Sequence, residues 1–180
     1  MQIYKLFSQS PYAKKLRFSD FSTRVITGDS EVAFGLRVEP EHYREFMNSI
    51  SNHLLKNKIS QHIMTDFKFI EFIRQSRKLN FELTDILFYN EEQYGNDELI
   101  SELKENFWDF NLEQILVLLD EAINNGYKIF SITGNFQNSK GEYEQIKIYA
   151  NGTLSIENNF DEVSKYPIID YLIKGPEVLL

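Results

Sequence analysis

Residues 141–158, GEYEQIKIYANGTLSIEN, alternate between polar and apolar side chains on both sides of an Asn-Gly pair. Such alternation predicts half-buried β-strands, and Asn-Gly predicts a turn between them. A two-residue turn would scatter the apolar residues over both faces of the hairpin. A three-residue connection, 150–152, instead pairs Ile148 with Leu154 and gives Gly152 the left-handed conformation of a G1 bulge. We therefore predict a one-sided antiparallel hairpin with a polar outer face.

Other segments predict helices beside an antiparallel sheet. A hairpin is expected near 23–38, with Ile26 opposite Val32, and a meander over 127–157 includes the stretch above. Apolar residues recur at helical spacing in four further segments, namely 40–57, 60–78, 98–107 and 112–125. Helices packed on the apolar face of an antiparallel sheet make an α+β fold. A chain of 180 residues suits one such domain over 1–180.

Several of these elements carry finer predictions. Ser60 is the expected N-cap of the 60–78 helix, and the side chains expected on its buried face are Ile63, Phe67, Ile70 and Ile73. The alternative for part of this segment, DFKFIEF, is a strand. The expected caps of the two later helices are Asp97 and Asn111. The expected inward side of the strand after Tyr127 consists of Phe130, Ile132 and Phe136. A short helix is expected from Pro167 to Lys174.

The chain contains no cysteine, which excludes disulfides, cysteine-ligated zinc and a cysteine nucleophile. Its start, MQIYKLFSQSPYAKK, lacks the apolar core and the cleavage site of a signal peptide. The longest apolar run, from Ile115 to Leu119, is far shorter than the roughly 20 residues that a membrane span needs. We therefore expect a cytoplasmic protein without a membrane segment.

Charge is distributed unevenly along the chain. Residues 1–80 contain 13 Lys and Arg against 8 Asp and Glu, whereas residues 81–180 contain 6 against 19. The formal net charge of -8 disfavours direct nucleic-acid binding. The uneven split predicts an acidic docking face, unless the two halves interleave in the fold and the charges average out.

No motif in the sequence specifies a chemistry. His42 and His53 lie roughly 16 Å apart along one predicted helix, so they cannot share a metal ion. Ser101 and Lys104 match S-x-x-K, but the companion Lys-Thr-Gly element is absent. The glycine-containing segment 133–142 lacks the residue order of a phosphate-binding P-loop. We expect no catalytic residue, no metal site and no cofactor.

The segment 91–109, EEQYGNDELISELKENFWD, holds seven acidic residues and one base, Lys104, next to an aromatic cluster. Complementary charge speeds association with a basic partner, and tryptophan is a common interface anchor. The candidate partner-binding residues are these acids, the tryptophan and the outward tyrosines of the hairpin, namely Glu91, Glu92, Asp97, Glu98, Glu102, Glu105, Trp108, Asp109, Tyr143 and Tyr149. The alternative is a solvent-exposed helix face whose acidic side chains stabilise the N-terminal end of the helix through the helix dipole.

Three functions are compatible with these observations. The first is a cytosolic binding or inhibitory protein whose acidic surface masks a basic partner protein, a physical type common among immunity proteins and phage counter-defence proteins. The second is a hydrolase or transferase with a dispersed site of Asp, Glu and His side chains. The third is a structural or assembly protein that pairs through a sheet face or edge. We favour the first over an enzyme, and the oligomeric state stays open.

Overall fold

The alternating segment contains two strands, β7 (Tyr143–Tyr149) and β8 (Thr153–Ile156). Three residues, 150–152, connect them, as predicted. Gly152 has a φ of +74°, which is the left-handed conformation predicted at that position. The boundaries of the connection and the conformation of its glycine therefore follow from the face pattern, while the pairing of Ile148 with Leu154 stays a prediction.

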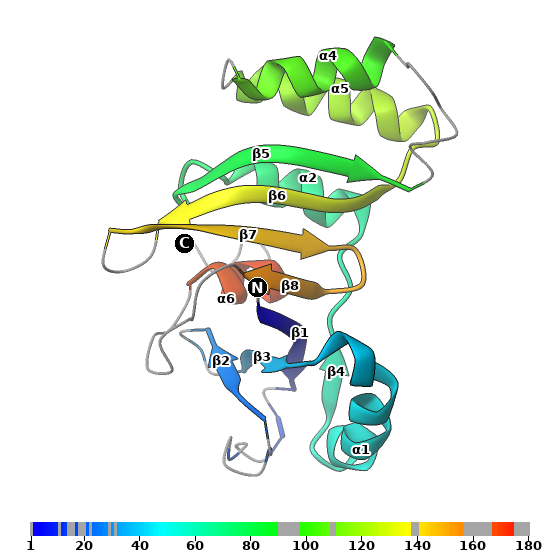
Figure 1. The fold of residues 1–180 in the computed structure, drawn as a ribbon, viewed down its shortest axis with the longest axis vertical. Helices are drawn as coiled ribbons and strands as arrows, with labels where there is room; N and C mark the ends of the chain where they lie inside the picture. The colour runs from blue at the N-terminus through cyan, green and yellow to red at the C-terminus, as the bar shows by residue number, and fades with distance from the viewer. Residues whose placement is uncertain are drawn as a thin grey trace. The chain divides into compact units, whose positions relative to one another are not determined.

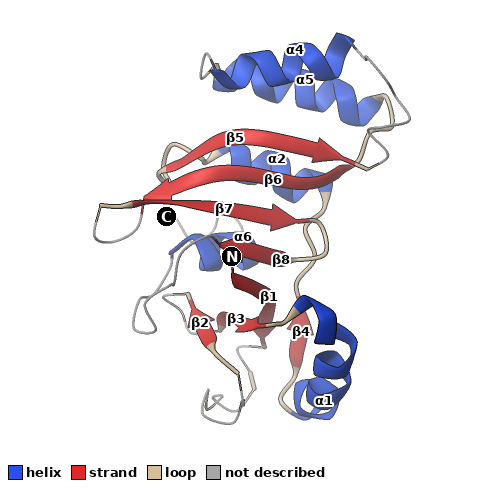
Figure 2. Ribbon diagram, in the orientation of Figure 1, coloured by secondary structure: helices blue, strands red, loops and turns tan. Residues whose placement is uncertain are grey.

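The computed structural model describes residues 2–10, 12–13, 17, 21, 23–28, 30, 32–89, 98–108, 111–137, 141–156 and 167–174. These residues form eight strands in antiparallel pairs and five α-helices, which confirms the predicted α+β class (Figure 2). The chain divides into two compact units: unit 1 comprises Met1–Ile63 and Asn151–Leu180, and unit 2 comprises Met64–Ala150. A single domain over 1–180 stays a prediction.

Unit 1 is built around β1 (Gln2–Gln9). One edge of β1 pairs with β3 (Ala33–Arg37), and β3 pairs in turn with β2 (Val25–Thr27). The other edge of β1 is shared, because its first half pairs with β8 and its second half pairs with β4 (Ile59–Gln61). Two chain segments that are far apart in the sequence therefore meet end to end beside the middle of β1.

This junction is closed by hydrogen bonds from β1. The Leu6 nitrogen donates to the Gly152 oxygen at 2.9 Å, and the His62 nitrogen donates to the Leu6 oxygen at 3.0 Å. The Lys5 ammonium donates to the His62 oxygen at 3.1 Å and to the Asn151 oxygen. A Cβ atom on Gly152 would lie only 2.0 Å from the His62 oxygen. The junction therefore requires glycine for space as well as for its positive φ.

The predicted hairpin near 23–38 forms, but its register is different. Ile26 lies opposite Gly35 and not opposite Val32, and the Gly28 nitrogen donates to the Ala33 oxygen at 2.8 Å. The Ile26 side chain fills the space over Gly35, where a Cβ atom would lie 2.9 Å from Ile26 Cγ1. Packing over a glycine therefore decides the register, and the predicted pairing of Ile26 with Val32 is wrong.

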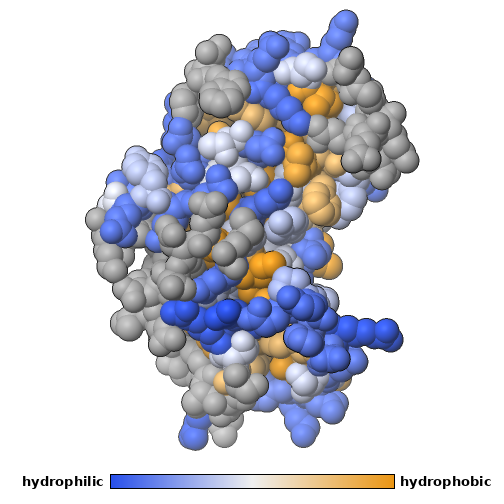
Figure 3. Space-filling model, in the orientation of Figure 1, coloured by the Kyte–Doolittle hydropathy of each residue, from blue (hydrophilic) through white to orange (hydrophobic). Residues whose placement is uncertain are grey.

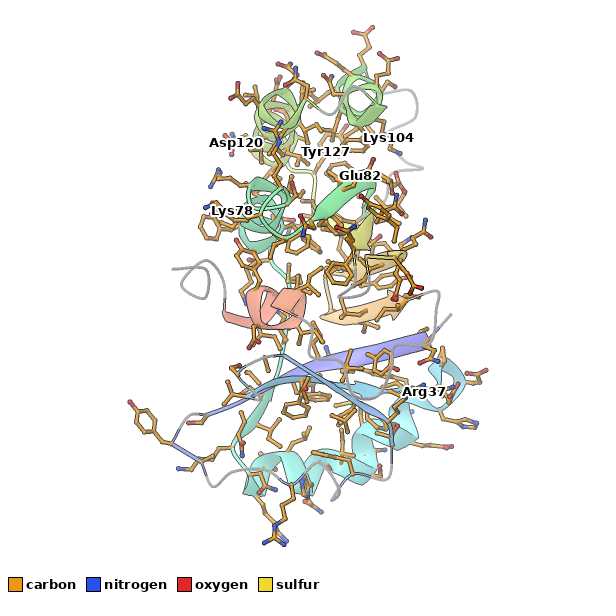
Figure 4. All side chains as sticks on the ribbon, turned by 90° about the vertical axis from the view of Figure 1, so that its left-hand side faces the viewer. Arg37, Lys78, Glu82, Lys104, Asp120 and Tyr127 are labelled. Atoms are coloured by element: carbon orange, nitrogen blue, oxygen red, sulfur yellow. The ribbon has the colours of Figure 1, made fainter. Side chains whose placement is uncertain are left out.

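Two helices cover unit 1. The predicted helix 40–57 appears as a 3₁₀ turn, η2 (Pro40–His42), followed by α1 (Tyr43–Lys56). α1 packs partly buried Phe46, Met47 and Ile50 against a core cluster of Phe7, Phe21, Phe34, Leu36, Leu54 and Ile59. α6 (Pro167–Lys174) matches its predicted range and contacts β3 and β1. Within unit 1, Figure 4 shows α1 and α6 on opposite sides of the strands.

Unit 2 contains a three-stranded antiparallel sheet in the order β7-β6-β5, formed with β6 (Ile129–Gln137) and β5 (Phe81–Phe88). Its helices are α2 (Asp66–Arg74), α4 (Glu98–Trp108) and α5 (Leu112–Asn124). α2 contacts α5 and β6, and α4 contacts α5 and β5 (Figure 1). The buried side chains of this unit include Phe69, Phe72, Ile73, Phe81, Ile86, Leu103, Ile115, Leu119, Ile132 and Ile148.

The predicted helix 60–78 is shorter, and a different face of it is buried. Ser60 lies in β4, and Thr65 is the N-cap, since its side chain accepts a hydrogen bond from the Lys68 nitrogen at 3.3 Å. Phe67 is 70% exposed, whereas the buried residues of α2 are Phe69, Phe72 and Ile73, of which Ile73 alone was predicted to be buried. Pairing of β4 with β1 removes the first predicted turn, and the phenylalanine-rich segment offers a second apolar stripe at helical spacing.

A β-bulge changes the outward face of β6. Leu87 pairs with Ser131 and Phe88 pairs with Ile129, so Phe130 has no partner on β5. The extra residue of a bulge breaks the strict alternation of side chains between the two faces of a sheet. Phe130 is consequently 37% exposed, and its predicted place on the inward side of the strand is wrong.

Candidate functional site

α4 presents a stripe of carboxylates along one side. Glu98, Glu102 and Glu105 follow i, i+4, i+7 spacing and are all exposed. Leu103 and Phe107 lie on the opposite side and are buried in unit 2. The predicted helix 98–107 is therefore confirmed, together with the outward direction of its acids.

α5 carries further carboxylates on its exposed side. The Asn111 side chain accepts a hydrogen bond from the Gln114 nitrogen at 3.2 Å, which confirms the predicted N-cap. Glu113, Asp120 and Glu121 are exposed, and so is Val117, at 60%. Since α4 and α5 pack against each other, their carboxylates belong to one helical pair.

We call the six exposed carboxylates of this pair the acidic helix surface: Glu98, Glu102, Glu105, Glu113, Asp120 and Glu121. Lys104 is the one basic residue within 98–108 and 111–124. None of the six carboxylates forms an ion pair within the part of the chain that the structure describes. Hydrophilic side chains gather over the helical pair at the top of Figure 3.

The structure brings together only part of the predicted partner-binding set. Glu98, Glu102 and Glu105 lie on α4, whereas Tyr143 and Tyr149 lie on β7. The positions outside the described residues are Glu91, Glu92, Asp97 and Asp109, and the side chain of Trp108 is likewise outside them. Glu113, Asp120 and Glu121 were not in the predicted set. Their i, i+7, i+8 spacing in the predicted helix 112–125 already places them on one side of that helix.

The outer face of the unit 2 sheet carries a row of aromatic rings. Tyr149 and Phe130 have ring centroids 5.7 Å apart, and Phe130 and Tyr89 have centroids 5.1 Å apart, both in edge-to-face geometry. The Lys147 ammonium lies 5.5 Å from the centroid of the Tyr149 ring. We call Tyr89, Phe130 and Tyr149 the outer aromatic row. Sequence reasoning found only Tyr149, because the bulge that exposes Phe130 depends on pairing with β5.

A cavity of about 300 Å³ opens in unit 2, where the turn after α2 meets β5 and the ends of α4 and α5. Its apolar lining consists of Phe81, Leu83, Phe107, Leu112 and Ile115, and its polar lining of Ser76, Arg77, Asn80, Glu82, Gln137 and Tyr143. The volume lies at the lower end of the range for ligand pockets, roughly 300–1,000 Å³. Of these residues the sequence singled out only Tyr143, since the lining comes from separate segments of the chain.

The three histidines do not share a site. His42 Nδ1 lies 3.2 Å from Glu45 Oε2 on the exposed side of the first helix. The His53 ring packs on Phe21, with centroids 4.8 Å apart, and His62 is buried beside β1. The residues that line the cavity include no histidine. Within the described ranges, no three His, Asp or Glu side chains are placed to hold a metal ion.

Among the ionisable groups that the structure describes, Lys5 has the most perturbed pKa. It is 2% exposed, it lies on the same face of β1 as Phe7, and burial lowers its pKa from 10.5 to about 8. A lysine with a lowered pKa is a possible nucleophile. However, the ammonium donates hydrogen bonds to the two backbone carbonyls of the junction, and it is shielded from solvent. The geometry therefore assigns Lys5 a structural role.

Among the helices that the structure describes, none combines the length and the apolar character needed to cross a membrane. Comparison of the chain with protein-family models, with curated proteins and with solved structures finds no match.

Proposed function

We propose that this protein binds a basic partner protein through the acidic helix surface and masks the partner's positive charges, as a cytoplasmic inhibitory protein would. The observation that carries the proposal is the exposure of six carboxylates, with one lysine, on two helices that pack together. Charge of one sign on a surface steers a partner of opposite charge and raises the association rate. An acidic surface of this kind therefore supports recognition of a basic protein.

The spacing of the α4 carboxylates supports cooperative attraction. Glu98 and Glu105 are seven residues apart, which is roughly 10 Å along a helix axis. The Debye length at physiological ionic strength is about 8 Å. A cation docked beside Glu102 therefore feels all three carboxylates, and added salt weakens their attraction. Val117, exposed among the α5 acids, offers an apolar contact in addition.

The proposal is tested by affinity capture from a host lysate at low and at high salt. The test variant combines Glu98→Gln, Glu102→Gln and Glu105→Gln, which removes the α4 stripe without changing side-chain size. The matched control neutralises three exposed carboxylates of unit 1 in the same way, at Glu39, Glu41 and Glu45.

We expect the wild-type protein and the unit 1 control to retain one basic protein at low salt and to release it at high salt. The α4 variant should lose that protein, while circular dichroism shows an unchanged fold. Retention of the same protein by the α4 variant, or capture that is insensitive to salt, would contradict a docking role for the acidic helix surface. Purified partner and protein then give the dissociation constant directly.

A second candidate function is self-assembly through the sheet face of unit 2. The observation that favours it is the outer aromatic row, in which Tyr89 is 45% and Phe130 is 37% exposed. Contiguous exposed aromatic surface is typical of interaction sites. Sedimentation over a range of protein concentrations tests this function, with Phe130→Ser as the variant and Val117→Ser as a control at an exposed apolar residue elsewhere. Dimerisation lost only in Phe130→Ser would support assembly, and a monomer at all concentrations would contradict it.

A further inference from the structure

The cavity of unit 2 has a floor that is formed before any ligand arrives. The Phe81 ring packs edge-to-face on Phe72, with centroids 4.9 Å apart. Gly134 provides the space for this ring, since a Cβ atom there would lie 2.4 Å from Phe81 Cζ. Phe107 and Ile115 are buried and complete an apolar surface. Preformed apolar surface of this kind binds a compact apolar group without a cost of rearrangement.

The rim of the cavity is held by a fixed turn. The Phe81 nitrogen donates to the Ser76 oxygen at 2.9 Å, and the Gln137 nitrogen donates to the Asn80 oxygen at 3.3 Å. Asn80 has a φ of +51°, a left-handed conformation that asparagine tolerates better than most residues. The turn therefore holds the backbone that carries Arg77, which lies between Ser76 and Asn80.

Two opposite charges line this cavity without pairing. Arg77 and Glu82 both contribute to the lining, one from the turn and one from β5. In the described part of the chain neither side chain forms an ion pair with the other or with a third group. The lining thus includes one basic and one acidic residue beside an apolar floor.

We propose that this cavity binds a small zwitterion of the α-amino-acid type with a ring-sized apolar side chain. The ring lies against Phe81, Phe107 and Ile115, the ligand carboxylate meets Arg77, and the ligand ammonium meets Glu82. Arginine suits a carboxylate because its guanidinium donates two parallel hydrogen bonds. The site is separate from the acidic helix surface, so the proposal holds whether or not that surface docks a basic protein.

The polar lining supports an α-amino acid over a purely apolar ligand. Gln137 and Asn80 carry amide groups that both donate and accept, and Tyr143 carries a hydroxyl. The Gln137 amide nitrogen already donates to the Gly141 oxygen at 3.2 Å, but an apolar molecule that displaced water would offer no partner to the other polar groups, whereas the ammonium and carboxylate of an amino acid would. The small volume restricts the ligand to about one ring with its backbone atoms.

The experiment is a titration of the full-length ¹⁵N-labelled protein, followed by amide chemical shifts. The probe is L-phenylalanine, and three analogues each lack one feature: phenethylamine lacks the carboxylate, 3-phenylpropionate lacks the ammonium, and glycine lacks the ring. We expect L-phenylalanine to shift the amides of the cavity residues at millimolar concentration. Phenethylamine and 3-phenylpropionate should each bind at least about fivefold more weakly, which is the effect of one charged contact at a partly exposed site. Glycine should also bind at least about fivefold more weakly, because it buries no ring against the apolar floor.

Variants separate the two charged contacts. Arg77→Met should abolish the preference for L-phenylalanine over phenethylamine, and Glu82→Gln should abolish its preference over 3-phenylpropionate. Lys78→Met is the matched control, because this neighbour of Arg77 does not line the cavity; it should leave both preferences unchanged.

Three outcomes would overturn the proposal. The first is the absence of shifts at the cavity residues up to about 10 mM L-phenylalanine, because a dissociation constant above that concentration is too weak for specific recognition. The second is equal binding of all three aromatic probes. The third is an unchanged pattern of preferences in both Arg77→Met and Glu82→Gln. The amide spectrum of each variant reports directly whether it is folded, so loss of binding is distinguished from loss of structure.

Discussion

Replacing Lys5 by methionine tests the structural role of the buried ammonium. Methionine keeps a long unbranched side chain but removes the charge and the donors to the His62 and Asn151 carbonyls. Burial lowers the pKa of Lys5 from 10.5 in the unfolded chain to about 8 in the fold. The difference, 10.5 − 8, is about 2.5 units and corresponds to about 3 kcal/mol at about 1.36 kcal/mol per unit.

The sign of the pH dependence follows from proton binding. Between pH 8 and 10.5 the unfolded chain holds a proton at Lys5 that the folded chain has lost, so a rising pH favours the folded chain. The cost of burying the ammonium is fully present below pH 8 and disappears above pH 10.5. Across this window the wild-type protein should gain about 3 kcal/mol of unfolding free energy relative to Lys5→Met, which has no proton to lose.

The stability of the variant at neutral pH combines two opposing effects. Lys5→Met removes the cost of the buried charge, about 3 kcal/mol, but it leaves two buried carbonyls without this donor, at about 1–3 kcal/mol each. The two effects partly cancel at pH 7, so the variant should then lie between about 1 kcal/mol more stable and about 3 kcal/mol less stable than the wild-type protein. Near pH 10.5 only the loss of the hydrogen bonds remains, and the variant should be clearly less stable.

Urea unfolding followed by far-ultraviolet circular dichroism measures this difference at several pH values and constant ionic strength. Lys56→Met, at an exposed lysine of α1, is the matched control for the loss of one positive charge from unit 1. We expect a pH-dependent difference from the wild-type protein for Lys5→Met and none for Lys56→Met. A difference for Lys5→Met that stays constant within about 0.5 kcal/mol from pH 7 to 10.5 would refute a buried ammonium at this junction.

Three other changes have defined effects on thermal and urea unfolding. Gly152→Ala should destabilise the protein by about 3 kcal/mol or more, because the new methyl group meets the His62 carbonyl and the residue keeps a positive φ; a loss below about 1 kcal/mol would contradict this crowding. Leu103→Ala should cost about 2–5 kcal/mol, whereas Val117→Ala, at an exposed position, should change stability by less than about 0.5 kcal/mol. Asn111→Ala should cost about 1 kcal/mol, since it removes the N-cap of α5, and no loss would show that the cap is replaceable.

The elements that were predicted correctly depend on a few neighbouring residues. Asn111 caps α5 with its own side chain, and Gly126 ends that helix with a φ of +94°. Gly152 takes its predicted positive φ in the connection between β7 and β8. In each case the physical cause lies within one or two turns of chain, so the pattern of residue types is sufficient. The α+β class follows from summing such local elements.

The predictions that failed depend on residues far away in the sequence. α2 begins at Asp66 and not at residue 60 because residues 59–61 pair with β1, about fifty residues earlier. Phe130 turned outward because β6 bulges against β5. Ile26 took its register from the space over Gly35. The periodicity of a single segment cannot predict these contacts, because each of them depends on pairing or packing with another strand.

The two candidate sites differ in the same way: one depends on local helical spacing and the other on contacts between distant segments. The acidic stripe of α4 was found because helical spacing alone brings Glu98, Glu102 and Glu105 to one side. Nothing in the sequence distinguishes Arg77 and Glu82, because a cation and an anion five residues apart are common in any solvent-exposed segment. They become a candidate site only because a turn places both on one cavity, whose floor comes from helices about thirty residues later. The residues that line such a cavity are brought together by packing between distant segments, and this packing cannot be predicted from a single sequence without motifs.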